Sequence, residues 1–254
     1  MKHLLVPSFL LLLCGACNKE VFFDGPNFYQ DDFETYTSLV TLLPPSELFW
    51  SFNQLTRAGN TITVDSTKAH GGRKSLRFVA EKSAEGVVSK ASIAKQNMAF
   101  WEGETMRMSA WYFIEGTDSL KWLFLMDVEE QTPIGAGPGM RLALVDNQLR
   151  VEYKFFEKDI LQTPEQTTEM PRNQWVELIW EIKLSRKNAG AVKLWQNRKL
   201  IIDAQNKTTL PKDVLYFQQG TKGMYSSFEI GITANSADND LVLWVDDIRI
   251  EKLN

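Results

Sequence analysis

The chain has few cysteines, which cross-link small secreted proteins, and few histidines, which commonly transfer protons in enzymes. Its 254 residues include two cysteines, Cys14 and Cys17, and two histidines, His3 and His70. Because both cysteines lie near the N-terminus, they cannot cross-link the body of the chain, and its stability must come from an apolar core. The formal net charge of −4 gives no electrostatic footprint for binding nucleic acid.

Long apolar runs are also absent after the N-terminal segment, which has the features of a secretion signal. The apolar stretch Leu4–Leu13 follows Lys2 and is too short to span a bilayer as a helix. The sequence Gly15-Ala16-Cys17 resembles the lipobox of bacterial lipoproteins, in which the cysteine becomes the lipidated first residue. Cys14 departs from that pattern, which usually has an aliphatic residue there. An ordinary cleaved signal with an incidental cysteine is the alternative.

The rest of the chain shows no repeat, low-complexity tract or change of composition. We therefore expect a lipoprotein signal peptide over residues 1–16, a tether over 17–27 and one domain over 28–254. Lipidation at Cys17 places the protein in a bacterial cell envelope, at the outer membrane or the cell surface. Its contact with the membrane would be through the lipid anchor alone.

Short segments with alternating apolar and polar residues predict an all-β domain. Between residues 175 and 184 the apolar side chains alternate with charged ones, and Asp146-Asn147 and Asn197-Arg198 are typical hairpin turns. Many antiparallel strands in one domain of this length favour a jelly-roll β-sandwich. The clearest strands are Thr61–Val64, Ser75–Val79, Met106–Ile114, Trp122–Val128, Met140–Val145, Leu149–Phe155, Trp175–Leu184, Val192–Gln196, Lys199–Ile202, Phe228–Thr233 and Leu241–Ile250.

The last predicted strand contains an acidic residue in an unexpected place. Counting by twos, Asp246 shares a face with Trp244 and Ile248, which predicts that it points into the core. A buried carboxylate without a partner costs several kcal/mol or more. Asp246 therefore needs a metal ion, a basic side chain or converging backbone N–H donors.

Three segments together resemble known families. Asp31-Asp32-Phe33-Glu34, the stretch from Ala69 to Phe78, and Leu243–Ile248 follow the order found in β-sandwich carbohydrate-binding modules. Asn173–Leu178 and Gly190–Asn197 resemble concanavalin A-like polysaccharide lyases related to heparin lyase I. The resemblance implies a jelly roll of the concanavalin A-like lectin and glucanase type.

In the binding modules the first-strand acid, turn carbonyls and the terminal-strand aspartate form a structural calcium site. The resemblance implies that Glu34 and Asp246 are calcium ligands, together with backbone oxygens near Gly72 and Lys74. Calcium prefers several oxygen ligands, and it would neutralise Asp246. The alternative is that Asp246 pairs with a basic side chain, for which the candidates are Arg73, Lys74 and Arg77.

Lyase chemistry requires a group that neutralises the uronate carboxylate and a base near the C5 proton. In the related lyases a late strand supplies Lys and Tyr, whereas Glu229 and Thr233 occupy those positions here. These two differences disfavour lyase activity. His70 lies in the turn motif, where a histidine is explained by packing, so we assign it a structural role. An active lyase would have to use Tyr225 and Lys222 with Arg141 or Lys154.

Hydrolase chemistry requires two carboxylates across a glycosidic bond. Asp127 and Glu129 share a face of one predicted strand, as in the E-x-D-x-E strand of jelly-roll endoglucanases. The position of the nucleophile is Leu125, so the covalent mechanism is lost. We expect a solvated strand end or a second ion site there.

A binding surface is better supported, because several strands present charged residues opposite their apolar face. Arg141, Arg150, Glu177 and other charged residues would form one polar face if their strands are neighbours. Sugar recognition combines planar aromatic rings with charged or amide groups. The candidate glycan-binding residues are Arg141, Glu152, Lys154, Lys193, Trp195, Gln218, Gln219 and Tyr225.

The sequence thus predicts a lipid-anchored, calcium-stabilised jelly roll that binds a polysaccharide and lacks catalysis, in glycan recognition or utilisation. Two alternatives stay open. One is a polysaccharide lyase that cleaves uronic-acid polymers by β-elimination. The other is a structural or assembly lipoprotein that binds a protein partner.

Overall fold

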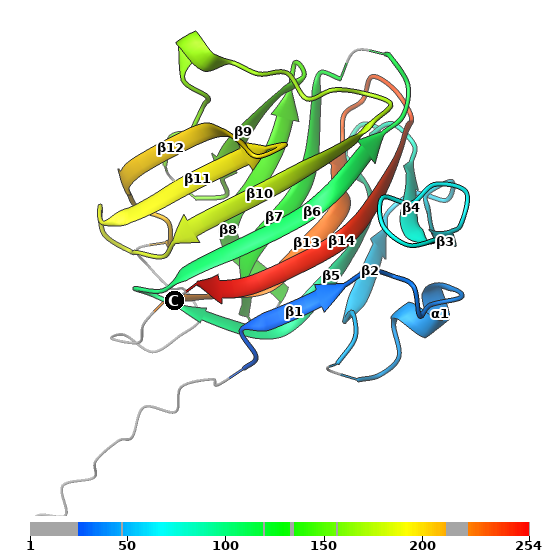
Figure 1. Cartoon of the computed structure of the whole chain (residues 1–254), viewed down its shortest axis with the longest axis horizontal. Coiled ribbons are helices and arrows are strands. Elements are labelled where there is room, and N and C mark those ends of the chain that lie inside the picture. Colours follow the sequence, from blue (N-terminus) through cyan, green and yellow to red (C-terminus); the bar gives the residue numbers. More distant parts are fainter. Residues whose placement is uncertain are drawn as a thin grey trace, which may run out of the picture.

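The computed structural model describes residues 25–46, 48–118, 120–132, 135–155, 157–211 and 223–253. Two antiparallel sheets face each other, as Figure 1 shows, and an apolar core lies between them. This arrangement confirms the predicted jelly-roll β-sandwich. The helical segments of the described chain are α1 (Leu39–Leu42) and the 3-10 turn η1 (Pro164–Gln166). Neither has the length or the apolar sequence needed to cross a membrane.

Sheet A has eight strands in the order β12-β11-β10-β6-β14-β4-β3, with β1 paired to β14. Their bounds are β1 Phe28–Asp31, β3 Thr61–Asp65, β4 Ser75–Ala80, β6 Thr105–Ile114, β10 Trp175–Lys183, β11 Gly190–Gln196, β12 Lys199–Lys207 and β14 Leu241–Leu253.

Sheet B has six strands in the order β2-β5-β13-β7-β8-β9. Their bounds are β2 Phe52–Leu55, β5 Ser89–Trp101, β7 Trp122–Thr132, β8 Gly135–Val145, β9 Gln148–Tyr153 and β13 Met224–Asn235.

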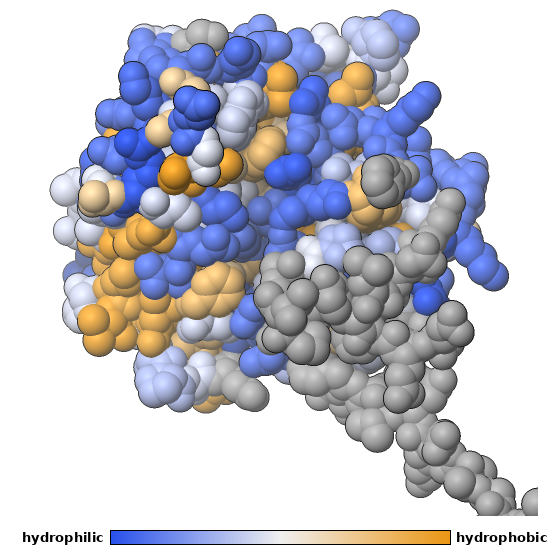
Figure 2. Space-filling model, turned by 180° about the vertical axis from the view of Figure 1, so that it is seen from behind, coloured by the Kyte–Doolittle hydropathy of each residue, from blue (hydrophilic) through white to orange (hydrophobic). Residues whose placement is uncertain are grey.

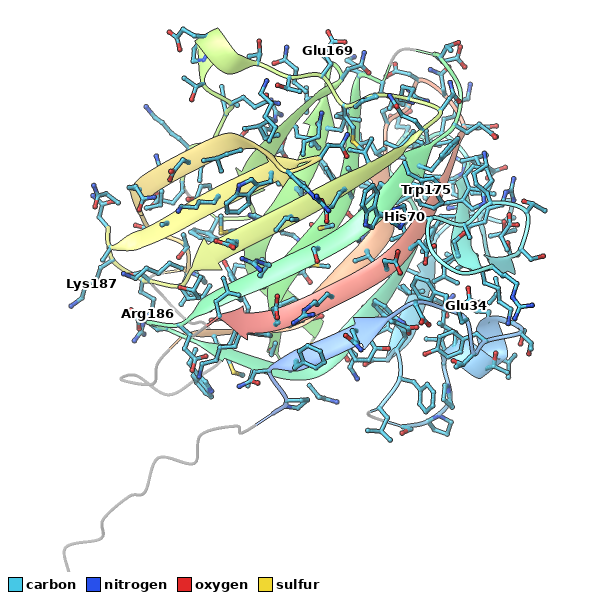
Figure 3. The ribbon with its side chains drawn as sticks, in the orientation of Figure 1. Glu34, His70, Glu169, Trp175, Arg186 and Lys187 are labelled. Atoms are coloured by element: carbon cyan, nitrogen blue, oxygen red, sulfur yellow. The ribbon has the colours of Figure 1, made fainter. Side chains whose placement is uncertain are left out.

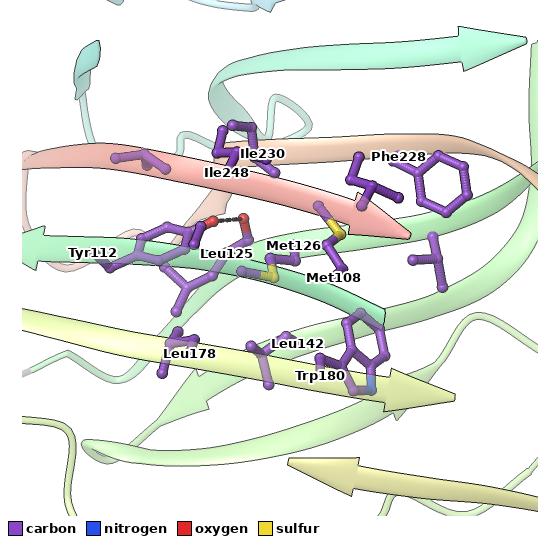
Figure 4. Close-up of a cluster of buried hydrophobic side chains, with 14 of the residues drawn as sticks. Met108, Tyr112, Leu125, Met126, Leu142, Leu178, Trp180, Phe228, Ile230 and Ile248 are labelled. Atoms are coloured by element: carbon purple, nitrogen blue, oxygen red, sulfur yellow. Dashed lines mark hydrogen bonds between the residues drawn. The ribbon is translucent and has the colours of Figure 1, made fainter. Parts of the chain in front are cut away.

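The core lies between the sheets and is built from the inward side chains of both. In β10 every second residue is buried, as the alternation predicted, and β6 follows the same pattern beside it. Figure 4 shows part of this core, where Trp180 of sheet A packs near Leu142 of sheet B. The dashed line in Figure 4 marks a hydrogen bond within this core, which Tyr112 Oη donates to Leu125 O at 2.9 Å. A fully buried Leu or Trp contributes roughly 1.5–3 kcal/mol, so alternation fixes which face points inward.

Two hairpin turns are confirmed. Asp146-Asn147 joins β8 to β9 and Asn197-Arg198 joins β11 to β12. All four residues have positive φ, between 47° and 66°. This geometry matches the right-handed twist of the paired strands, which is why Asn and Asp are favoured in such two-residue links.

The predicted orientation of Asp246 is wrong, and a β-bulge explains why. The register of β14 against β6 shifts between Asp246 and Arg249, and Asp247 has φ 48°. Before the bulge Leu243 and Val245 point into the core, and after it Ile248 does. One extra residue therefore changes the phase of the alternation, so that Asp246 lies on the outer side of sheet A.

The glycine-rich segment at residues 135–139 belongs to strand β8. Gly139 pairs with Glu129 of β7, and a Cβ at this position would lie 1.9 Å from Val128 O. Only glycine lets the two backbones approach this closely. Strands seldom contain several glycines, so the composition of this segment is unusual for a strand.

Asp31 fixes the N-terminal strand to the sandwich. Its Oδ2 accepts hydrogen bonds from Tyr29 Oη at 3.1 Å, Tyr36 Oη at 2.7 Å and Trp50 Nε1 at 2.9 Å, and its Oδ1 accepts the Phe33 N–H at 2.9 Å. Burial and the charge of Asp31 raise the pKa of Tyr29 and Tyr36, so both hydroxyls remain donors. One carboxylate thus organises the chain from β1 to the start of β2.

We expect Asp31→Ala to lower the free energy of unfolding by about 2–4 kcal/mol, because several partly buried donors lose their acceptor. Denaturant unfolding measures the change. The matched control is Asp32→Ala, whose exposed carboxylate accepts only the local Glu34 N–H among the hydrogen bonds found for it. An equal, small effect of both substitutions would contradict this role of Asp31.

Candidate functional site

The outer face of sheet B carries two cross-strand rows of polar side chains. The first row runs across four neighbouring strands. Glu229 of β13 lies opposite Asp127 of β7, and Asp127 lies opposite Arg141 of β8. Arg141 lies opposite Glu152 of β9. In the second row Ser227 lies opposite Glu129, which faces Gly139. We call the set formed by Asp127, Glu129, Arg141, Arg150, Glu152, Lys154, Ser227 and Glu229 the sheet B face. Figure 2 views the molecule from this side, and hydrophilic side chains cover much of its coloured part.

Ion pairs connect the basic residues of the sheet B face to its carboxylates. Lys154, directly after β9, contacts Glu129 closely and lies 3.8 Å from Asp127 Oδ2. The Lys154 N–H donates to Gly139 O at 2.8 Å, which holds Lys154 beside β8. Arg141 Nε lies 3.3 Å from Glu152 Oε2. The expected solvated strand end at Asp127 and Glu129 is therefore a largely buried charge network.

On the sheet B face the basic side chains are more exposed than the acidic ones. The side chains of Asp127, Glu129 and Glu152 are 4%, 7% and 12% exposed. Those of Arg141, Arg150 and Lys154 are 26%, 30% and 23% exposed. The face therefore presents cationic groups outward, with the carboxylates beneath them.

An aromatic group adjoins these cations. The Arg141 guanidinium lies 4.0 Å from the ring centroid of Phe124, which packs against Trp122 at 4.9 Å. A guanidinium over an aromatic ring is held in place by cation–π attraction. Sugar rings use such aromatic surfaces for their apolar faces.

Glu229 is a buried carboxyl on this face whose pKa is raised. Its Oε1 accepts a 2.9 Å hydrogen bond from Gln54 Nε2 and a closer one from Ser92 Oγ. Burial, followed by the negative charge of Asp127, raises the pKa of Glu229 to about 7. Glu229 is thus poised to gain or lose a proton near neutral pH.

The structure brings together only part of the predicted glycan-binding set. Arg141, Glu152 and Lys154 lie on the sheet B face, whereas Lys193 and Trp195 of β11 lie in sheet A, on the other side of the sandwich. Gln218 and Gln219 lie outside the described residues, as do Lys222 and Cys17. The predicted single surface is corrected accordingly, because alternation cannot tell which sheet a strand joins.

Tyr225 lies away from the predicted groove, although β13 crosses sheet B. It is fully buried in the core, and its Oη donates to Thr209 O at 2.6 Å. Burial raises its pKa well above the ordinary value, so it stays a neutral donor. Its described position therefore separates Tyr225 from Arg141 and Lys154.

Glu229 was not among the predicted site residues, although it was noted as a departure from the lyase pattern. Its outward orientation could have been predicted from Phe228 and Ile230, which point inward on either side. Its partners Ser92 and Gln54 come from β5 and β2, which the sequence pattern did not reveal. Phe124 was missed because a bulge in β7 disturbs its alternation.

The predicted metal residues form a clasp around the turn that precedes β4. Asp246 Oδ2 accepts the N–H groups of His70 at 2.8 Å and Gly71 at 3.1 Å, and its Oδ1 accepts the N–H of Asp247 at 2.8 Å. Burial raises the pKa of Asp246 to about 6, and the amide donors oppose this rise. Figure 3 shows His70 beside Trp175 at this end of the sandwich. Converging backbone donors, one of the three expected solutions, thus stabilise Asp246.

Glu34 accepts hydrogen bonds from backbone N–H groups on the other side of the same turn. Its Oε1 accepts the N–H groups of Arg73 at 2.6 Å and Lys74 at 2.7 Å, and these backbone hydrogen bonds lower its pKa. The Lys74 ammonium donates to Glu34 O at 2.6 Å and Tyr36 O at 2.9 Å. Lys74 therefore binds backbone oxygens that a metal ion could otherwise use.

The fit of a calcium ion can be judged from these contacts. Calcium requires six to eight oxygen ligands, usually with several carboxylates. Within the described residues no three His, Cys, Asp or Glu side chains are grouped so that they could hold a metal. The described clasp suits an ammonium group and amide donors better than calcium, and a calcium ion at Glu34 and Asp246 stays a proposal.

Comparison with known proteins identifies relatives of the fold. A family model described as polysaccharide lyase matches residues 46–249. The comparison with curated proteins gives no significant match.

Several solved structures are similar at low sequence identity. The endo-beta-1,4-glucuronan lyase of the fungus Trichoderma reesei is 15% identical with a TM-score of 0.63, over 80% of this chain and 90% of that one. A cellulose-induced protein is 16% identical with a TM-score of 0.60, over 87% and 96%. An alginate lyase is 10% identical with a TM-score of 0.56, over 91% and 99%. At these identities the likeness concerns the fold.

The next test distinguishes the two cations considered for the clasp, which are the Lys74 ammonium and the proposed calcium ion. We expect Lys74→Met to lower the free energy of unfolding by about 1–3 kcal/mol, because two carbonyl oxygens lose a charged donor. If the Lys74 ammonium alone occupies the clasp, a chelator leaves the melting temperature of the original protein unchanged. The control is Lys82→Met, because Lys82 is exposed and forms no ion pair with a described residue. A melting temperature that falls on chelation and recovers with added calcium would establish the calcium site instead.

Proposed function

Since the chain belongs to the polysaccharide lyase family, we propose that it binds an anionic polysaccharide containing uronic acids along the sheet B face. The observation that carries this proposal is that the basic side chains of the sheet B face are more exposed to solvent than the acidic ones. Arg141, Arg150 and Lys154 reach the surface, whereas their carboxylate partners lie beneath them. Two of the similar structures are lyases named for glucuronan and alginate, which are polymers of uronic acids.

The spacing of the face suits an extended polymer. Neighbouring strands lie about 4.8 Å apart, so a chain that crosses β7, β8 and β9 meets a different charged side chain at each strand. Arginine binds a carboxylate through two parallel hydrogen bonds, and the neighbouring Phe124 offers an apolar surface to a sugar ring. Both kinds of contact are found in glycan recognition.

We propose binding without cleavage as the primary activity. Glu229 and Thr233 occupy the positions where the resemblance implies Lys and Tyr, and Tyr225 is bonded to Thr209 inside the core. Cleavage by β-elimination is the second candidate. It is favoured by Arg141 and Lys154, which lie on the same face and could neutralise a uronate carboxylate.

We further propose that Cys17 carries a lipid that anchors the protein in a bacterial cell envelope, at the outer membrane or cell surface. The support is the sequence Gly15-Ala16-Cys17 after an apolar segment. Metabolic labelling with a fatty acid should mark the protein and not its Cys17→Ala variant. Labelling of the variant to the same extent would contradict this anchor.

Arg141→Ala should weaken binding to alginate or glucuronan about tenfold or more. The reason is that a hydrogen bond to a charged group contributes roughly 1.5–3 kcal/mol. Lys193→Ala is the matched control, because it removes a cation from the other sheet. Titration calorimetry at low ionic strength measures both affinities, and added salt should weaken binding of the original protein.

The outcomes distinguish the candidate functions. Equal affinities of the Arg141→Ala and Lys193→Ala variants would reject the sheet B face as the binding site. Ultraviolet absorbance from unsaturated sugar ends would establish a lyase and overturn binding without cleavage. If no uronic-acid polymer binds while a defined protein partner does, the assembly alternative is favoured.

A further inference from the structure

Two acidic side chains lie side by side on the sheet B face. Glu229 of β13 and Asp127 of β7 are directly opposite in the strand pairing, and both point away from the core. Side chains at such positions have Cβ atoms roughly 4.5–5.5 Å apart. The two residues are 4% and 3% exposed, so water screens their mutual repulsion poorly.

The hydrogen bonds around the pair leave one acceptor without a donor. Glu229 Oε1 accepts from both Gln54 and Ser92. Asp127 Oδ2 lies 3.8 Å from Lys154 Nζ, whereas the buried Asp127 Oδ1 accepts no hydrogen bond from any described residue. A proton on Glu229 removes the repulsion and makes Glu229 a hydrogen-bond donor on the face where Asp127 lies opposite it.

The charged groups around Glu229 determine its pKa. Asp127 lies opposite Glu229 on β7, and Glu129 lies two residues further along that strand, opposite Ser227. Lys90 attracts Glu229 from β5, and Lys154 attracts it from the end of β9. Burial and the charge of Asp127 outweigh the two lysines, which is why the pKa of Glu229 is raised to about 7.

The proton changes the net charge of the binding face. With Glu229 neutral, the carboxylates Asp127, Glu129 and Glu152 balance the cations Arg141, Arg150 and Lys154. Loss of the proton adds a second negative charge next to Asp127 and leaves the face with an excess of negative charge. An anionic ligand then meets repulsion, and Lys154 is drawn further toward the carboxylates.

We propose that Glu229 and Asp127 share one proton and that this proton controls binding of an anionic glycan to the sheet B face. The glycan binds while the pair is singly protonated, and it binds more weakly after the pair has lost the proton. This inference rests on the proposed function, because it assumes that the ligand carries carboxylates.

The sign of the effect follows from linkage. A carboxyl whose pKa is raised in the folded protein holds its proton to higher pH than in the unfolded chain. The free energy of unfolding therefore falls as pH rises from the ordinary value near 4.5 to about 7. By the same reasoning, a bound polyanion favours the protonated pair and raises its pKa further.

The test measures alginate affinity at pH values from about 5.5 to about 8.5, a range that spans the raised pKa. We expect the affinity of the original protein to fall about three- to tenfold across this range, beyond the change that a control variant shows. Glu229→Gln keeps the shape and carries no charge, so it should bind nearly equally at both ends. Glu181→Gln, on sheet A, is the matched control and should retain the original pH profile.

A second measurement does not depend on the glycan. Carbon-13 NMR of glutamate-labelled protein should show two carboxyls that titrate near pH 7, because burial also raises the pKa of Glu130 to about 7. The Glu229 signal is the one that is absent in Glu229→Gln and shifted to lower pH in Asp127→Asn. Titration of Glu229 at the ordinary value would overturn the shared proton, as would identical pH profiles of the original protein and Glu229→Gln. If alginate and glucuronan bind at no pH while the NMR titration is seen, the proposed function fails and the shared proton stands.

Discussion

The alternation of side chains along a strand is the constraint on which this structure depends. Each strand of the sandwich has one face in the core, so its other side chains must point outward. In β7 the inward Met126 and Val128 force Asp127 and Glu129 onto the outer side, and Arg141 and Glu152 follow in β8 and β9. The charged rows of the sheet B face are therefore a consequence of packing, with their order set by which strands are neighbours.

The same constraint explains which parts of the fold could be predicted from the sequence. Strands such as β10, with unbroken alternation, were identified, and so were the hairpin turns at Asp146 and Asn197. Strand β5 was missed, because Asn97 with φ 60° interrupts it and small residues fill much of its length. The orientation of Asp246 was wrong for a related reason, since one residue inserted at Asp247 changes every later side chain of β14.

The candidate site could be predicted only where local pairing determines it. Arg141 and Glu152 face each other because a two-residue hairpin fixes the register of β8 and β9. Glu229 and Asp127 lie a hundred residues apart in the chain, and their contact depends on the order of strands in sheet B. Lys193 has the same sequence pattern as Arg141, yet its strand joins sheet A. Such distant pairings follow from the global topology, which periodicity does not encode.

The ion pairs of the sheet B face also determine how a ligand can bind. A carboxylate that approaches Arg141 must compete with Glu152, so a single sugar gains little from one contact. Successive sugars of a polymer that each add a weak contact bind much more tightly together, because the later contacts form at high effective concentration. The pairing also keeps Arg141 oriented over Phe124, which lowers the entropy lost on binding. A face of paired charges is thus suited to a long anionic polymer and poorly suited to its monomer.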